Sequence, residues 1–245
     1  TAGPGLVTSL VVGVEAARAL SYAWGEVPIV RTNHIEGHIY SVLLGDNPPT
    51  EIPFPCIALI VSGGHTELIL MRGHGDYTLI GRTRDDAVGE CFDKAAKVMG
   101  LEYPGGPKIS KLATEGARDA IAFPRPMRTS DDFDFSFAGL KTAVLYYLRD
   151  SPTTNHADVC ASFEQAVTDV LVAKTLRAAR EYTAASVILA GGVSANRYLR
   201  EGLHNALTRE LPACTVLIPE LKYTTDNAAM IAAAGWFHAQ NREFT

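Results

Sequence analysis

The chain has 245 residues, of which 47% are hydrophobic and 20% are charged, and its formal net charge at pH 7 is −5. This length suffices for one large domain or two smaller lobes, and the acidic balance excludes an overall basic field that would attract nucleic acid. No apolar run approaches the roughly eighteen residues of a membrane span, and the first residues contain neither the basic nor the apolar part of a secretion signal. The composition therefore predicts a cytoplasmic protein without a membrane span.

The cysteines are far apart in the sequence and form no Cys-x-x-Cys pair; they are Cys56, Cys91, Cys160 and Cys214. This spacing argues against a zinc ribbon and against a disulfide framework. Free structural thiols in a reducing compartment are the expected state.

Apolar periodicity and turn residues divide the chain into alternating helices and strands. Helices are predicted at 6–24, 34–44, 84–99, 108–115, 143–149 and 158–182, from 197 onward, and at 228–239. Strands are predicted at 27–30, 57–61, 67–71, 77–82, 186–190 and 215–219. The first helix is expected to pack on a sheet, and the proline-rich segment 45–55 is expected to be a linker or a crossover between lobes. The alternation indicates an α/β fold.

Two glycine pairs follow strands. Ser62, Gly63 and Gly64 lie between two apolar runs, where the glycines can adopt positive φ and leave backbone N–H groups free for a phosphate or another anion. Taken alone, such a motif is more often only a hairpin turn. The second pair, at 191–192, stands between a strand and a helix, but it lacks both the Gly-x-Gly-x-x-Gly pattern and a Walker lysine.

A histidine pair opens the helix predicted at 34–44, with Asn33 as its cap. His34 and His38 are four residues apart and share one helix face, so they are spaced to hold one metal ion. Hydrogen-bonded structural histidines are the alternative. The pair is not a zincin motif, because Glu36 stands two residues after the first histidine instead of one. A third ligand must come from elsewhere, and Asp226, before the last helix, is the candidate.

Two groups of charged residues stay open to two interpretations. The first forms one side of the helix predicted at 84–99, and its members are Asp86, Glu90, Asp93, Lys94 and Lys97. Such a stripe is either a solvated face with ion pairs or a source of carboxylates for sugar hydroxyls. The second group consists of basic residues that either face a polyanion or are scattered over the surface: Arg118, Arg125, Arg128 and Lys141.

Six motifs occur in the order and approximate spacing of the TsaD/YgjD/Gcp family. They lie at 33–38, at 61–68, at 85–94 together with 103–107, at 134–142, at 191–200 and at 225–234. On these motifs the chain is identified as a member of that family, whose activity makes N6-threonylcarbamoyladenosine in tRNA. The resemblance implies an actin-like α/β fold of the ASKHA type, shared with sugar kinases, Hsp70 and actin, with two lobes and a nucleotide between them. Residues 1–55 and 224–245 would belong to the first lobe, and 56–223 to the second.

The resemblance also implies roles for single residues. His34, His38 and Asp226 match the family's metal ligands, for one divalent ion that is iron(II) or, as the alternative, zinc. The residues implied to contact the nucleotide or the threonylcarbamoyl group are Ile60, Val61, Ser62, Gly63, Gly64, Asp93, Gly106 and Asn196. No residue is predicted as a general base.

The reaction implied is transfer of threonylcarbamoyl from threonylcarbamoyl-AMP to the N6 amine of the adenosine beside the anticodon of ANN-decoding tRNAs. The implied partners are tRNA, a paralogous actin-like subunit of the TsaB type and a small ATPase of the TsaE type. Family members begin with a strand and an Asp-Glu-Thr-type phosphate loop ahead of the Ala-Gly-Pro-Gly-Leu segment at 2–6. We therefore expect an incomplete first lobe and little or no activity of the isolated 245-residue fragment.

Two other functions remain alternatives on sequence grounds. A metal-dependent glycoprotease needs a glutamate that activates water beside the histidine pair, and Glu36 has the wrong register for that role. A non-catalytic actin-like subunit would bind nucleotide and partners only. The set of three metal ligands argues against it, because a scaffold needs no metal.

Overall fold

A mixed β-sheet forms the centre of the computed structural model, which describes residues 1–241. The described residues give it five strands in the order β3-β2-β1-β4-β5. These strands are β1 (Cys56–Val61), β2 (Thr66–Gly73), β3 (Asp76–Arg82), β4 (Ser186–Ala190) and β5 (Thr215–Leu217). The β1–β2 and β2–β3 pairs are antiparallel, whereas β1–β4 and β4–β5 are parallel. The sheet thus joins a meander to a parallel half at β1.

Strand β1 is buried on both faces, as its uninterrupted apolar run predicts. Leu59 stands opposite Leu68 on one side and Leu189 on the other. Leu59 belongs to the larger of two hydrophobic cores, while its neighbour Ile60 belongs to the smaller one. Because successive side chains of a strand point to opposite faces, β1 contributes to the cores above and below the sheet.

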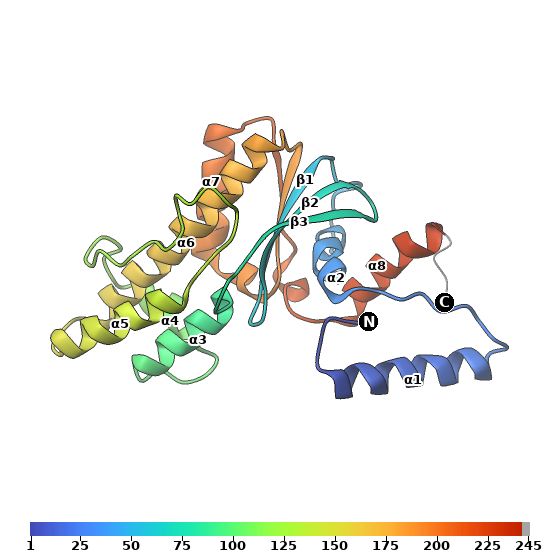
Figure 1. Cartoon of the computed structure of the whole chain (residues 1–245), viewed down its shortest axis with the longest axis horizontal. Helices are drawn as coiled ribbons and strands as arrows, with labels where there is room; N and C mark the ends of the chain where they lie inside the picture. The colour runs from blue at the N-terminus through green and yellow to red at the C-terminus, as the bar shows by residue number, and fades with distance from the viewer. Residues whose placement is uncertain (242–245) are drawn as a thin grey trace.

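Helices cover the two faces of the sheet unequally (Figure 1). One face carries α3 (Val88–Val98), α4 (Gly105–Ala113), α5 (Ala138–Asp150), α6 (His156–Glu181) and α7 (Arg197–Glu210). The other carries α2 (His34–Tyr40) and α8 (Ala228–Gln240), which come from opposite ends of the described chain and pack on each other. Short 3₁₀ turns lie at Ser41–Leu43, Gly192–Ala195 and Leu221–Tyr223. Among the described helices, none is both long and apolar enough to span a bilayer.

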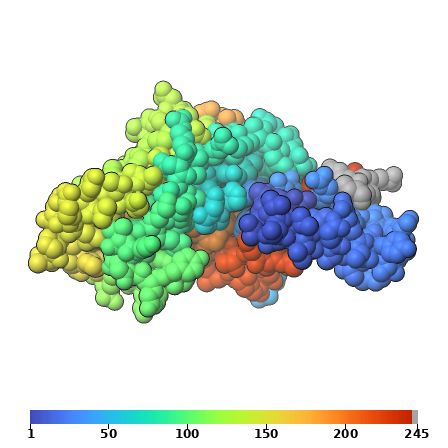
Figure 2. All heavy atoms as spheres, turned by 60° about the horizontal axis from the view of Figure 1, so that its bottom comes forward, coloured from blue at the N-terminus to red at the C-terminus, as the bar shows by residue number. Residues whose placement is uncertain are grey.

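Helix α1 (Val7–Ala23) lies apart from the two cores, at the outside of the molecule (Figures 1 and 2). None of its residues is buried against the rest of the described chain, so the predicted packing of 6–24 on a sheet is absent from this structure. Two backbone hydrogen bonds join the segments that precede and follow α1. The N–H of Ala2 donates to the carbonyl of Thr32 at 2.9 Å, and the N–H of His34 donates to the carbonyl of Gly3 at 2.7 Å.

Three predicted boundaries differ from the structure. The segment 27–30 is not among the strands of the sheet. Helix α4 begins at Gly105, ahead of the predicted 108. Helix α5 begins at Ala138, ahead of the predicted 143, because the Asp85 carboxylate accepts the N–H groups of Phe137 and Ala138 at 2.7 and 3.2 Å. This cap comes from a distant part of the chain, so local periodicity does not reveal it.

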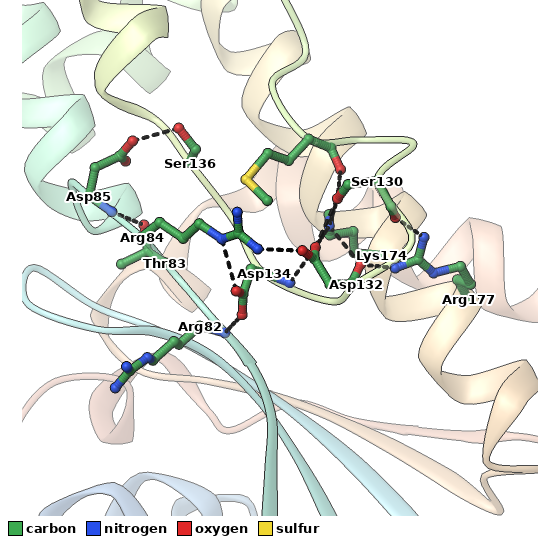
Figure 3. A network of polar contacts seen from close by, with 11 residues as sticks. Arg82, Thr83, Arg84, Asp85, Ser130, Asp132, Asp134, Ser136, Lys174 and Arg177 are labelled. Carbon is green, nitrogen blue, oxygen red and sulfur yellow. Dashed lines mark hydrogen bonds and ion pairs between the residues drawn. The ribbon is translucent and has the colours of Figure 1, made fainter.

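A buried lysine anchors the irregular segment 123–137 to α6 (Figure 3). Lys174 has 0% exposure, and its Nζ donates to Ser130 Oγ at 2.8 Å and to the carbonyl of Asp132 at 2.9 Å. Arg177 donates to the carbonyls of the same two residues. On the other side, Arg84 pairs with the Asp132 carboxylate at 2.5 Å. Burial lowers the pKa of Lys174, and the oxygens around it supply the partners that a buried ammonium requires.

Replacing this lysine is expected to loosen the segment. Lys174→Met keeps an unbranched chain of similar length but removes the hydrogen bonds that Lys174 donates to Ser130 Oγ and to the Asp132 carbonyl. We expect the free energy of unfolding to fall by about 2 kcal/mol, measured by urea titration. The matched control is Lys111→Met on the exposed side of α4, with an expected change within about 0.5 kcal/mol. Equal effects of the two substitutions would contradict the anchoring role.

Candidate metal and nucleotide site

Helix α2 holds the two histidines in a fixed relation. Its predicted cap is confirmed, because the Asn33 side chain accepts the N–H of Ile35 at 2.8 Å. His34 and His38 are one turn apart on the same face, with ring centroids separated by 4.8 Å. Both Nε2 atoms point toward the segment that precedes α8, as their distances to Asp226 show.

The close approach of α8 to α2 brings the third residue into place. A Cβ at Gly37, between the two histidines, would lie 2.8 Å from Ile231 Cδ1 on α8, so the helices meet where a side chain is missing. The turn before α8 then places Asp226 Oδ1 at 3.4 Å from His34 Nε2 and at 3.3 Å from His38 Nε2. The three predicted ligands, far apart in the sequence, therefore converge within 4.8 Å.

The electrostatics of the cluster suit a cation. The side chain of His38 is 2% exposed, and neither of its ring nitrogens has a hydrogen-bond partner among the described residues. Burial and then the charge of His34 lower the pKa of His38 to about 4, against an opposite effect of Asp226. A neutral imidazole without a partner, a second imidazole and a carboxylate form a donor set for a divalent transition metal. In the described part of the chain, this is the one group of three such side chains close enough to share an ion.

Glu36 has a different partner. It lies two residues from each histidine, which places it about 200° around the helix from them. Its carboxylate contacts His238 Nε2 on α8 at 2.5 Å. The glutamate that a metalloprotease would need beside the ion is therefore held on another face of α2.

The first glycine turn leaves its backbone donors free. Ser62 N–H donates to the carbonyl of His65 at 2.8 Å, and His65 N–H donates to Ser62 Oγ at 3.0 Å, which closes the turn. Gly63 and Gly64 are exposed, and their N–H groups donate to no described acceptor. Two adjacent free amides can hold an anionic oxygen. Ile60 and Val61, also predicted to border the ligand, have fully buried side chains, so only their backbone can reach it.

The second glycine turn packs on the end of β1, the strand that leads into the first turn. Gly191 has φ 92°, and a Cβ there would lie 2.4 Å from the carbonyl oxygen of Val61. The turn at 191–196 therefore adjoins the end of β1, because β1 and β4 are parallel neighbours. Helix α2 contacts β1 and β4, the two strands that lead into the glycine turns.

The other predicted residues gather around α4. Asp93 Oδ1 accepts the N–H of Gly105 at 2.7 Å, at the start of the helix that contains Gly106. Asn196 caps α7 by accepting the N–H of Leu199 at 2.9 Å. Its Nδ2 donates to Ser110 Oγ on α4 at 2.9 Å. A surface pocket of about 470 Å³ opens beside Asp93 and Gly105.

The two charged groups left open by the sequence are resolved in part. Lys94 pairs with Asp86 at 2.6 Å and with Glu90 at 2.9 Å, so much of the stripe on α3 consists of ion pairs. Of the basic residues, Arg118 and Arg125 pair with carboxylates of α6. Sequence reasoning did not identify Glu164, the partner of Arg118, because a single charge within a long amphipathic helix gives no local signal.

Comparisons with known proteins agree on one family. Residues 1–233 match the family model for TsaD, tRNA N6-adenosine threonylcarbamoyltransferase. A protein of that name from Geobacillus thermodenitrificans is 52% identical over 239 residues, covering 96% of this chain and 68% of the relative. One from Anaeromyxobacter dehalogenans is 50% identical over 240 residues, covering 96% and 70%. One from Enterococcus faecalis is 45% identical over 248 residues, covering 100% and 70%.

Solved structures share the fold at low sequence identity. The crystal structure of HypF from T. kodakarensis superposes with a TM-score of 0.68 at 14% identity, covering 93% of this chain and 39% of HypF. A full-length HypF in a phosphate- and nucleotide-bound form gives a TM-score of 0.62 at 13% identity, covering 88% and 36%. These likenesses show an actin-like ATPase-type fold, as the sequence motifs predict.

Proposed function

The chain belongs to the TsaD family of tRNA N6-adenosine threonylcarbamoyltransferases, and from that premise we propose which of its residues serve the transfer. The observation that carries the proposal is the convergence of His34, His38 and Asp226 at helix α2, which packs against β1 and β4, the strands that end in the two glycine turns. The site thus combines three side chains that can bind a cation with backbone N–H groups that are free to bind an anionic oxygen. Such a site suits a phosphorylated and carbonyl-containing substrate such as threonylcarbamoyl-AMP.

The three converging residues hold one divalent cation, iron(II) by preference and zinc as the alternative. When bound, the ion supplies Lewis-acid chemistry toward oxygen ligands of the substrate. His38 contributes a neutral donor that burial keeps unprotonated, and α2 fixes its direction. Asp226 contributes the negative charge that a site with two neutral imidazoles otherwise lacks.

The remaining residues bind and orient the substrate. The amides of Gly63 and Gly64 donate to phosphate or carbonyl oxygens, where they stabilise charge that develops during transfer. The free oxygen of Asp93 accepts a ribose hydroxyl, and Gly106 and Asn196 border the nucleoside. Positioning is the main contribution of the protein, because AMP is already an activated leaving group.

The substrate and partners follow from the family. The acceptor is the N6 amine of a tRNA adenosine, and the proposed partners are an actin-like subunit of the TsaB type and a small ATPase of the TsaE type, all in the cytoplasm. The net charge of −5 supports RNA binding that is shared with partners. We also propose that 1–55 and 224–245 belong to one lobe and 56–223 to the other, which the packing of α2 on α8 supports.

The alternative functions receive less support. A glycoprotease needs a free carboxylate beside the ion, and Glu36 is paired with His238. A non-catalytic subunit has no use for a buried neutral histidine without a hydrogen-bond partner, which is the state of His38 among the described residues.

Asp93→Asn tests the proposed contact with ribose. The amide oxygen can still accept the Gly105 N–H, whereas the new NH₂ group cannot accept a hydroxyl. We expect kcat/KM for threonylcarbamoyl-AMP to fall about tenfold, mainly through KM. The measurement is transfer of label to a tRNA transcript from threonylcarbamoyl-AMP that carries a labelled threonine group, at varied concentrations of threonylcarbamoyl-AMP, by the protein with its TsaB-type and TsaE-type partners.

The matched control for that substitution is Glu115→Gln, an exposed carboxylate just beyond α4, which is expected to leave both kinetic constants unchanged. An unchanged KM in Asp93→Asn would remove Asp93 from the proposed site. Absence of any tRNA labelling by a chain that also carries the family's N-terminal strand and phosphate loop, assayed with both partners, would overturn the proposed function itself.

A further inference from the structure

A buried carboxylate lies behind Asn196. Glu164, in the middle of α6, is 1% exposed. Its Oε1 accepts a hydrogen bond from Asn196 Nδ2 at 2.7 Å, and its Oε2 accepts one from Arg118 Nη1 at 2.9 Å. Both oxygens are therefore occupied, and the carboxylate has one defined orientation. A buried ionised group with a cation on one side and an amide on the other meets the conditions under which such a group is tolerated.

The contact fixes the direction of the Asn196 amide. An ionised carboxylate only accepts hydrogen bonds, so the NH₂ group of Asn196 must face Glu164. The amide oxygen then faces the first turn of α7, where it accepts the N–H of Leu199. Two partners thus fix the amide: Glu164 accepts from its nitrogen end, and the N–H of Leu199 donates to its oxygen end. Without an acceptor at Glu164, the amide loses the stronger of these two partners.

The same contact sets the distance between two helices of the proposed nucleoside site. The other acceptor of Asn196 Nδ2 is Ser110 Oγ, one turn beyond Gly106 on α4. Because Glu164 holds the same NH₂ group, it stabilises the contact between the start of α7 and α4. On its outer side, Arg118 lies over the ring of Tyr198 at 3.3 Å, and this cation–π contact holds the guanidinium against the carboxylate.

We propose that Glu164 is a positioning residue for nucleotide binding, which acts by holding the Asn196 amide and its contact with α4. The inference rests on the proposed function, because it takes Asn196 and Gly106 to border the nucleoside. On this proposal Glu164 must supply an acceptor oxygen to Asn196, whereas its negative charge is not required. Those two requirements are separable by substitution.

Two substitutions of similar size separate them. Glu164→Gln removes the charge but keeps an oxygen that can accept from Asn196, whereas Glu164→Met removes both. We expect Glu164→Met to weaken AMP binding about tenfold, and Glu164→Gln to weaken it less than about threefold. Affinity is measured by isothermal titration calorimetry with AMP, and metal content is measured in parallel and is expected to stay unchanged.

Asp169→Asn is the matched control, because Asp169 is on the same helix and also pairs with an arginine, Arg125 at 3.0 Å, but does not contact Asn196. Its AMP affinity is expected to equal that of the unsubstituted protein. Equal weakening in Glu164→Gln and Glu164→Met, or no weakening in Glu164→Met, would overturn the inference. Asn196→Ala tests the nucleoside site separately from the role of Glu164. If it leaves AMP affinity unchanged, the proposed nucleoside site itself is wrong.

Discussion

His38→Ala is expected to reduce bound metal from about one ion per chain to less than about a tenth of that, and to lower threonylcarbamoyl transfer more than about a hundredfold. His38 is the buried member of the cluster, and its nitrogens have no other partner among the described residues. Its loss leaves His34 and an exposed Asp226, which are too few protein ligands for a stable site. Elemental analysis of anaerobically purified protein measures the first effect, and tRNA labelling measures the second.

Two further variants make the result specific. Asp226→Asn is expected to lose the same ion, which would show that residues from distant parts of the sequence form one site. His204→Ala, an exposed histidine on α7, is expected to keep both metal and activity. Full metal content in His38→Ala would show that the histidine pair is structural.

Gly191→Ala is expected to lower the free energy of unfolding by more than about 3 kcal/mol. Two costs combine at this position. The backbone has φ 92°, which a residue with a side chain rarely adopts, and the new Cβ would lie 2.4 Å from the carbonyl oxygen of Val61. Relief requires the turn at 191–196 to move away from β1, which also disturbs the proposed anion site. Urea titration followed by far-UV circular dichroism measures the change.

The adjacent glycine provides the control for this prediction. A Cβ at Gly192 would meet no atom within 4 Å, and its φ lies outside the left-handed region. Gly192→Ala is therefore expected to change stability by less than about 1 kcal/mol. If Gly191→Ala proved as mild as Gly192→Ala, the close packing of Gly191 on the end of β1 would not be the constraint that the geometry indicates.

The parts of the fold that follow local rules were predictable from the sequence. The apolar run at 57–61 is β1, and Asn33 caps α2 as expected. What failed depended on distant residues. The start of α5 is fixed by Asp85, 52 positions before Phe137, and no local window contains that cap. The packing expected of 6–24 failed for a related reason, since periodicity shows that a helix has an apolar face but not what covers it.

The candidate site divides in the same way. The histidine spacing and the glycine pairs were visible as motifs, and the structure packs the histidine helix α2 on β1 and β4, the strands that lead into the glycine pairs. Glu164 was not visible, because a charged residue in an amphipathic helix is normally solvated. Its burial becomes apparent only when α4 and α7 are placed over α6, where Arg118 and Asn196 supply its partners.

The separation of the ligands along the chain has a thermodynamic consequence. His38 and Asp226 are 188 positions apart (226 − 38), so an ion bound by both closes a loop that contains most of the chain. An ion that binds the folded chain and not the unfolded one stabilises the fold by mass action, by about 2.7 kcal/mol when the free metal is at about a hundred times its dissociation constant. The proposed ion would thus act as a reversible cross-link between α2 and the start of α8. Binding of the ion and packing of α2 on α8 in the smaller core would then be coupled. Both would depend on the free concentration of the metal.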